Sequence, residues 1–232
     1  MSIKDFIANP LSYTKAHVVQ FTHAAYQPAV AGMQVAATMN HWFGAWTAEE
    51  YQRIANQYTD FRFIEAGLHV SGDGTSANLR IGKGKSAFHT IQPMSSAVDR
   101  GIRFLPWKAD TVTYMQLDAN ARTFFTGPLS GCSIFIGRDF NGTHWAFHAN
   151  RNSTGAPNPA IKDNMTTEVV RRLPAPVPIL CQAIYQTDYH ALGFVFGQMS
   201  SSGKWKFYVA DTAMGPGGLG VYTATTTVRE MH

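Results

Sequence analysis

Hydrophobic positions follow two different periods along this chain, and the change falls near residue 58. Before it, residues 51–58 place their apolar and aromatic side chains on one face of a helix. Thr47 and Glu50 have the spacing of a capping box, which marks a helix start. The pattern therefore predicts a helical N-terminal region over residues 1–58, as a small domain or as a cap on residues 59–232.

From about residue 60 onward, short runs rich in aromatic and β-branched residues alternate with Gly, Asn, Asp and Pro. The predicted strands cover residues 61–70, 77–83, 101–107, 111–117, 132–137, 143–149, 178–186, 190–197, 203–210 and 219–228. Residues 150–178 form a longer polar connection with a short helix near 166–172. So many short strands indicate two packed sheets or a barrel.

Composition and charge exclude several classes of protein. The chain has 232 residues, of which 45% are hydrophobic and 15% charged, enough apolar material for a core and too little charge for a disordered protein. The net charge of +4 is spread along the sequence, which argues against a nucleic-acid partner. No apolar run has transmembrane length and the first residues lack a signal-peptide core, so we expect no membrane span and no classical export signal.

Two cysteines are too few for a disulfide framework, and they lie in different settings. Cys181 ends the apolar run 177–181, where a buried inert thiol is expected. Cys132 follows a turn that contains Gly131, and His148 lies on the returning strand of the predicted hairpin. A thiol nucleophile needs a base within hydrogen-bond reach, because the thiolate is the attacking species. From these residues alone, the alternative for Cys132 is a buried structural cysteine.

The hairpin turn at 139–142 decides which histidine faces the cysteine. A turn centred near residue 140 puts Cys132 opposite His148, with Cβ atoms about 4.5–5.5 Å apart. His144 then lies roughly 13 Å along the strand, too far for proton transfer and too far from His148 to share a metal ion. Gly131 is expected to let the backbone turn sharply, with Cys132 N–H as an oxyanion donor. Ser130 is either a second polar contact or a surface turn residue.

The segment Phe124-Phe125-Thr126-x-x-Leu129-Ser130-Gly131-Cys132 resembles the Leu-Ser-Gly-Cys signature of glutamine deamidase toxins of the cytotoxic necrotizing factor and Burkholderia lethal factor type. Leu105-Pro106-Trp107-Lys108 is similar to a segment at a comparable distance before the cysteine of that family. The resemblance covers about residues 102–150. In the lethal-factor pattern the histidine follows the cysteine by twelve residues, which would select His144. The context Phe147-His148-Ala149-Asn150 instead matches at His148, so His144 is kept as the alternative base.

The resemblance implies an α+β fold, with a central β-sandwich of mixed and antiparallel strands flanked by helices. It also implies a deamidase in which Cys132 attacks a glutamine carboxamide, with His148 as base and then as acid toward ammonia. The thioester is then hydrolysed by water that His148 activates, which leaves glutamate. Thr126, six residues before the cysteine, would orient the histidine or bind the amide. The chemistry requires no metal or organic cofactor.

The implied partner is a host protein, either an RNA helicase of translation initiation or a Rho-type GTPase. The implied setting is a secreted or injected bacterial effector, expected to be a monomer, that acts as a toxin in the host cytosol. Two other functions stay open. The same Cys–His pair would serve a transglutaminase or another thiol hydrolase, and the same hairpin would suit a non-catalytic β-sandwich binding module.

Overall fold

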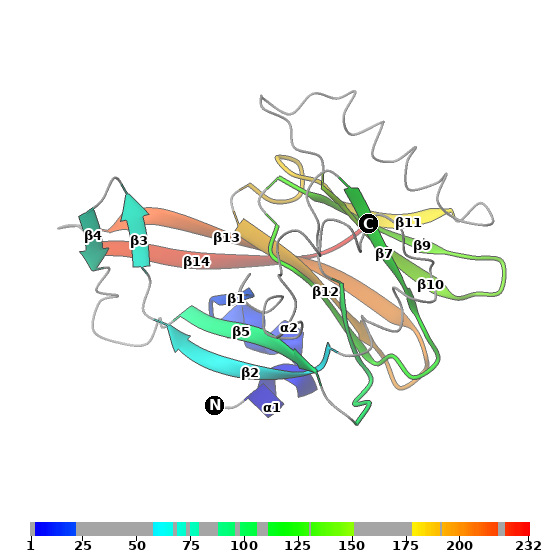
Figure 1. Cartoon of the computed structure of the whole chain (residues 1–232). Helices are drawn as coiled ribbons and strands as arrows, with labels where there is room; N and C mark the ends of the chain where they lie inside the picture. Colours follow the sequence, from blue (N-terminus) through cyan, green and yellow to red (C-terminus); the bar gives the residue numbers. More distant parts are fainter. Residues whose placement is uncertain are drawn as a thin grey trace.

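The computed structural model describes residues 3–21, 58–66, 69–72, 75–78, 88–95, 98–105, 111–129, 131–150, 178–190, 192–217 and 221–232. These residues form a mainly β protein with two short helices, in which two large sheets pack face to face (Figure 1). No helix in this described part is long and apolar enough to cross a membrane.

The larger sheet has five strands in the order β14-β13-β12-β8-β6. Their bounds are β14 (Val221–Glu230), β13 (Trp205–Gly217), β12 (Leu192–Met199), β8 (Thr123–Thr126) and β6 (Ile102–Leu105). β6 and β8 pair in parallel, whereas the other neighbours are antiparallel. The long β13–β14 hairpin closes one edge of this sheet, and the short strands β8 and β6 form the other.

The second sheet has four antiparallel strands in the order β11-β9-β10-β7. Their bounds are β11 (Ile179–Ala183), β9 (Ser133–Arg138), β10 (His144–Asn150) and β7 (Thr111–Leu117). Ile134 and Ile136 of β9 pack against Val195 and Val209 of the five-stranded sheet in one buried cluster. Because side chains alternate along a strand, every second residue of β9 faces this inter-sheet core.

The other face of the five-stranded sheet is covered by the N-terminal residues. These form α1 (Ile3–Ala8), α2 (Pro10–Ala16) and β1 (Val19–Phe21). Phe6 and Phe21 lie in one buried aromatic cluster with Phe104, Phe125 and Phe194. Figure 1 shows the helices on the side of β12–β14 that faces away from the four-stranded sheet. The described N-terminal residues therefore form a second core with the outer face of the five-stranded sheet.

Two smaller sheets complete the described architecture. β1 pairs in parallel with β5 (Phe88–Ser95), which in turn pairs with β2 (Tyr58–Ala66). β3 (His69–Gly72) and β4 (Thr75–Asn78) form a separate antiparallel pair.

The predicted pair of packed sheets is confirmed, but the N-terminal region contains less helix than the sequence predicted. Its helices end at residue 16 and a strand follows at 19–21. The helix predicted over 51–58 lies outside the described residues except for Tyr58, which begins β2. The short helix predicted near 166–172 also lies outside them. β5 and β8 were not predicted, because Pro93 interrupts the first and the second has only four residues.

A buried arginine joins the two large sheets near the start of β6. Arg103 is only 1% exposed, and its guanidinium contacts Asp99 at 2.9 Å and Asp118 at 2.8 Å. Asp118 directly follows β7, and it also accepts the backbone N–H groups of Asn120 and Ala121. The cluster therefore fixes the turn that carries the chain from the four-stranded sheet to β8.

Replacing Arg103 by Met should destabilise the protein by about 2–4 kcal/mol, because two carboxylates lose a buried partner. The lower part of that range reflects the partial exposure of both carboxylates, which lets water solvate them. Urea denaturation would measure the change, with Arg122→Met as the control at an exposed arginine. A loss equal to that of the control would contradict a linking role for Arg103.

Candidate active site

The candidate site lies where the chain leaves the five-stranded sheet and enters the four-stranded one. Between the end of β8 and the start of β9, Leu129 exchanges two backbone hydrogen bonds with Gly193, at 2.7 and 3.0 Å. Cys132 directly precedes β9, is 6% exposed and belongs to the inter-sheet core. Ser130 lies outside the described residues.

Gly131 gives this crossing segment its turn. Its φ of +122° lies in a region that L side chains rarely adopt, and it is exposed. Its N–H donates to the hydroxyl of Tyr189 at 3.0 Å. The same hydroxyl donates to the carbonyl oxygen of Cys132 at 2.7 Å. The backbone around the cysteine is therefore held by a tyrosine 57 residues away in the sequence.

Tyr189 is a site residue that the sequence did not reveal. It is fully buried and follows a tight turn in which Asp188 accepts the backbone N–H of Ile184. Burial, followed by the charges of Cys132 and other nearby groups, raises the pKa of the Tyr189 hydroxyl. Nothing in the local pattern around residue 189 distinguishes this tyrosine from others, because its partners are distant in the chain.

The hairpin register differs from the predicted one by two residues. β9 and β10 pair Ile134 with His148 and Arg138 with His144. The loop spans residues 139–143, because Asp139 N–H bonds to Thr143 O and the Asp139 carboxylate accepts the N–H groups of Asn141 and Thr143. The prediction that Cys132 lies directly opposite His148 is therefore wrong.

The corrected register still puts Cys132 and His148 on one face. Cys132 and Ile134 are two residues apart and both lie in the inter-sheet core. His148 is the direct partner of Ile134, so its side chain leaves the sheet on the same side. Cys132 and His148 are thus diagonal neighbours, a relation in which Cα atoms lie about 7–8 Å apart and long side chains can meet.

His148 is fully buried, and neither of its ring nitrogens has a hydrogen-bond partner among the described residues. Burial lowers the pKa of the imidazole to about 3, because the charged form loses its hydration. At neutral pH the ring is therefore uncharged. A buried polar atom without a partner costs free energy, so packing alone does not explain a histidine at this position.

The structure also describes Thr126 and His144. Thr126 is fully buried at the end of β8, and its hydroxyl accepts the backbone N–H of Val195 at 2.9 Å. This hydroxyl makes no hydrogen bond to His148, whereas its alternative role, binding of the substrate amide, stays a prediction. His144 lies opposite Arg138, six residues along β9 from Cys132, or roughly 20 Å. This distance favours His148 over His144 as the base.

A second histidine, His190, precedes β12 and contacts a carboxylate. The side chain of His190 is 62% exposed, and its Nδ1 lies 3.2 Å from a carboxylate oxygen of Asp211. The other oxygen of that carboxylate accepts the backbone N–H of His190 at 3.1 Å. Asp211 itself is 8% exposed. The carboxylate thus fixes both the backbone and the ring of His190, a pair that was not predicted from the sequence.

The second cysteine, Cys181, lies in different surroundings from Cys132. Cys181 lies opposite Ile136 within the sheet, and burial raises its thiol pKa to about 12. Neither cysteine forms a disulfide.

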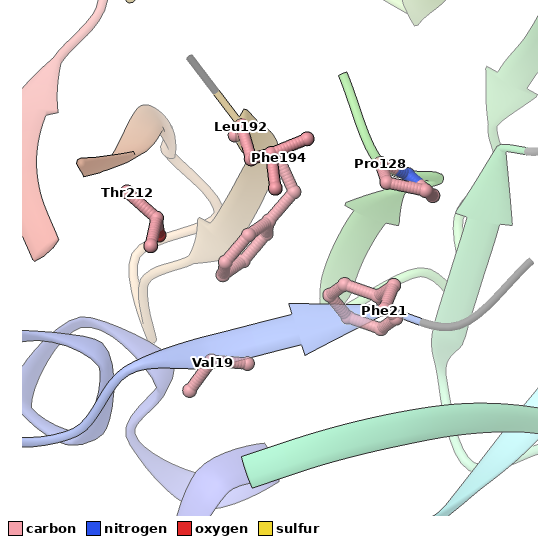
Figure 2. Close-up of a pocket in the computed structure, with 7 residues that line it drawn as sticks. Val19, Phe21, Pro128, Leu192, Phe194 and Thr212 are labelled. Atoms are coloured by element: carbon pink, nitrogen blue, oxygen red, sulfur yellow. The ribbon is translucent and has the colours of Figure 1, made fainter. Parts of the chain in front are cut away.

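A small apolar pocket beside Pro128 is lined by Phe21, Phe194 and Thr212 (Figure 2). It opens on the face of β12 that the N-terminal residues cover, because Phe194 belongs to their cluster.

No group of three or more His, Cys, Asp or Glu side chains among the described residues could hold a metal ion. Among the described residues, the Cys132 thiol and the buried His148 imidazole lie on one face of the sheet, and the Tyr189 hydroxyl bonds to the backbone of Cys132. These groups suit nucleophilic acyl chemistry with proton transfer.

Replacing His148 by Leu should remove part of the acid sensitivity of the fold. The unfolded chain takes up a proton on this histidine near pH 6.5, but the folded chain does so only near pH 3. Stability therefore falls as the pH drops through this window, by up to about 1.4 kcal/mol per pH unit from His148. Urea midpoints at pH 7.5 and 4.5 should differ less in the variant, and parallel pH profiles would contradict the burial of a neutral imidazole.

Comparison with known proteins shows a distant structural similarity. No protein-family model matches the chain, and no curated protein matches it. Among solved structures, the C-terminal domain of CNFy from Yersinia pseudotuberculosis is similar at a TM-score of 0.33 and 6% sequence identity. The alignment covers 62% of this chain and 65% of that domain, so the chain spans just under two thirds of its length. A similarity of this size establishes neither family nor function.

Proposed function

We propose that the protein is a thiol-dependent glutamine deamidase, a hydrolase that converts a glutamine carboxamide of another protein into a carboxylate. The observation that carries the proposal is the position of Cys132 at the end of the sandwich, on the same face as the unpartnered imidazole of His148. The resemblance of Leu129-Ser130-Gly131-Cys132 to the signature of deamidase toxins supports the same reaction.

In this mechanism Cys132 is the nucleophile and His148 takes the proton of its thiol. The two ring nitrogens of His148 have no protein partner, so one of them is available to accept a proton. Sulfur attacks the carboxamide carbon, the C–N bond breaks as the leaving nitrogen takes up a proton, and ammonia departs from a thioester. Water then attacks the thioester and gives up a proton, which replaces the one taken by the nitrogen. The C–S bond breaks, and the sulfur recovers its proton from His148.

Burial determines the resting state of this pair. Because the pKa of His148 is lowered to about 3, a thiolate–imidazolium pair is disfavoured while the site is empty. The proton is therefore transferred as the C–S bond forms, when the developing charge on the substrate oxygen gains hydrogen bonds from the turn. Gly131 N–H is engaged by Tyr189, so the backbone N–H of Cys132 is the proposed oxyanion donor.

The proposed substrate is a host protein, and the resemblance offers two classes. Deamidation of an RNA helicase of translation initiation would block protein synthesis. Deamidation of a Rho-type GTPase would remove the glutamine that positions the attacking water and would hold the switch on. Both readings make the protein a toxin that acts in the host cytosol after secretion or injection. We place the helicase first, because the sequence pattern is nearer to the lethal-factor type.

The direct test is to incubate the protein with each candidate target and to map the target peptides by mass spectrometry. After incubation with the wild type or Cys181→Ser, one glutamine-containing peptide of the target should gain about one dalton. After incubation with Cys132→Ser, the mass of that peptide should stay unchanged. His148→Gln should lower the rate by about 10²–10⁴-fold, because it removes the base. His144→Gln should stay close to the wild type.

Two outcomes would lead to different functions. Incorporation of an added amine at the same glutamine, in place of the mass gain of hydrolysis, would identify a transglutaminase. A Cys132 thiol that is as unreactive toward a thiol probe as Cys181 would exclude catalysis. The near-complete burial of Cys132 and His148 would then be the core of a non-catalytic β-sandwich binding module.

A further inference from the structure

The reaction proposed above needs a proton carrier that can reach water, and His148 does not meet that need. Its side chain is fully buried, so it cannot exchange a proton with bulk solvent. Departing ammonia requires a proton, and the water that cleaves the thioester must lose one. A second group, open to solvent and close to Cys132, would complete the reaction.

His190 has the geometry of such a group. In the tautomer with hydrogen on Nδ1, the ring donates to Asp211 at 3.2 Å and presents Nε2 as an acceptor. The second oxygen of the carboxylate holds the backbone of the same residue at 3.1 Å. A base that is oriented by a buried carboxylate is a recurring arrangement in nucleophilic catalysis.

The pair also lies at the right end of the sandwich. Asp211 is opposite Gly193 on β13, and Gly193 exchanges both backbone hydrogen bonds with Leu129 of the crossing segment. Asp211 is two residues from Val209 on the same strand, so its carboxylate is on the side of the inter-sheet core that contains Cys132. The pair is thus joined to the turn before Cys132 through a single backbone contact.

Tyr189 connects the two sets of residues directly. It precedes His190, and its hydroxyl bonds to Cys132 O at 2.7 Å and to Gly131 N–H at 3.0 Å. The pKa of this hydroxyl is raised first by burial, then by the charge of Cys132, and also by that of Asp211. Tyr189 thus holds the backbone of Cys132, and the next residue in the chain carries the imidazole that Asp211 contacts.

We infer that His190 is a second catalytic residue, which protonates the departing ammonia and activates the hydrolytic water, and that Asp211 is its positioning residue. This inference rests on the proposed deamidase function. It assigns the transfer of the thiol proton to the buried His148. The proton given to the leaving nitrogen and the proton taken from water are assigned to the solvent-exposed His190.

The steps balance with these two carriers. The cycle starts with protonated His190, neutral His148 and the Cys132 thiol. As sulfur attacks, the thiol proton passes to His148, and the C–N bond breaks while His190 gives its proton to the leaving nitrogen. Neutral His190 then takes a proton from water, whose oxygen attacks the thioester carbon. The C–S bond breaks, His148 returns its proton to sulfur, and His190 is protonated for the next cycle.

The activated ester p-nitrophenyl acetate separates the two halves of this cycle. Its leaving group needs no proton, so Cys132 should become acetylated in a burst whether or not His190 is present. Removal of the acetyl group needs activated water. In His190→Gln and Asp211→Asn we expect a burst like that of the wild type and deacetylation slowed by at least about tenfold. Intact mass should show acetyl-Cys132 accumulating in both variants.

A rescue experiment distinguishes a catalytic role from a structural one. Because His190 is 62% exposed, free imidazole can enter the space that His190→Ala leaves. Added imidazole should restore deacetylation of this variant beyond the acceleration that it produces in the wild type. His232→Gln, at another exposed histidine, serves as the matched control and should deacetylate at the wild-type rate. Cys181→Ser should give the wild-type burst.

The outcomes separate this inference from the function on which it rests. A normal burst with deacetylation within twofold of the wild type in His190→Gln would overturn the role of His190 and leave the thiol chemistry standing. An absent burst in the wild type would overturn both. A burst with slow deacetylation in the variants, but no deamidation of either target, would support His190 and refute the proposed substrates.

Discussion

The structure depends on how the chain crosses from one sheet to the other between β8 and β9. Only residues 127–132 are available for this step. Backbone polar groups that leave water on the way need hydrogen-bond partners. Gly193 satisfies Leu129, and the Tyr189 hydroxyl satisfies Gly131 N–H and Cys132 O. The same contacts that let the chain cross therefore fix the position of the thiol.

The two histidines of the proposed site differ in their exposure to solvent. His148 lies within the core, uncharged and without partners, because burial disfavours its cation. His190 lies in solvent, oriented by Asp211. In the proposed reaction, His148 exchanges a proton with the sulfur, and His190 exchanges protons with water and the leaving nitrogen. The buried and the exposed imidazole thus serve different steps of the proposed cycle.

The sequence predicted the local parts of this arrangement and failed on the distant ones. Period-two patterns located most strands and the Cys132–His148 hairpin, since both depend on neighbouring residues. The register was off by two because the Asp139 carboxylate closes a five-residue loop, which turn propensity alone does not distinguish from a shorter one. Tyr189 and Asp211 could not be predicted, because their role arises only when β12 and β13 meet the crossing segment.

The two cysteines differ in their position within the sandwich more than in their burial, and this position determines which polar groups surround each thiol. Cys181 and Cys132 belong to the same core cluster and are almost equally buried. Cys181 lies inside a strand opposite Ile136, where apolar neighbours raise its pKa to about 12 and keep it a thiol. Cys132 lies where a strand has yet to begin, next to an exposed glycine, a tyrosine hydroxyl and the diagonal His148. A sheet provides such a position only at its end, where the backbone must turn and solvent can enter.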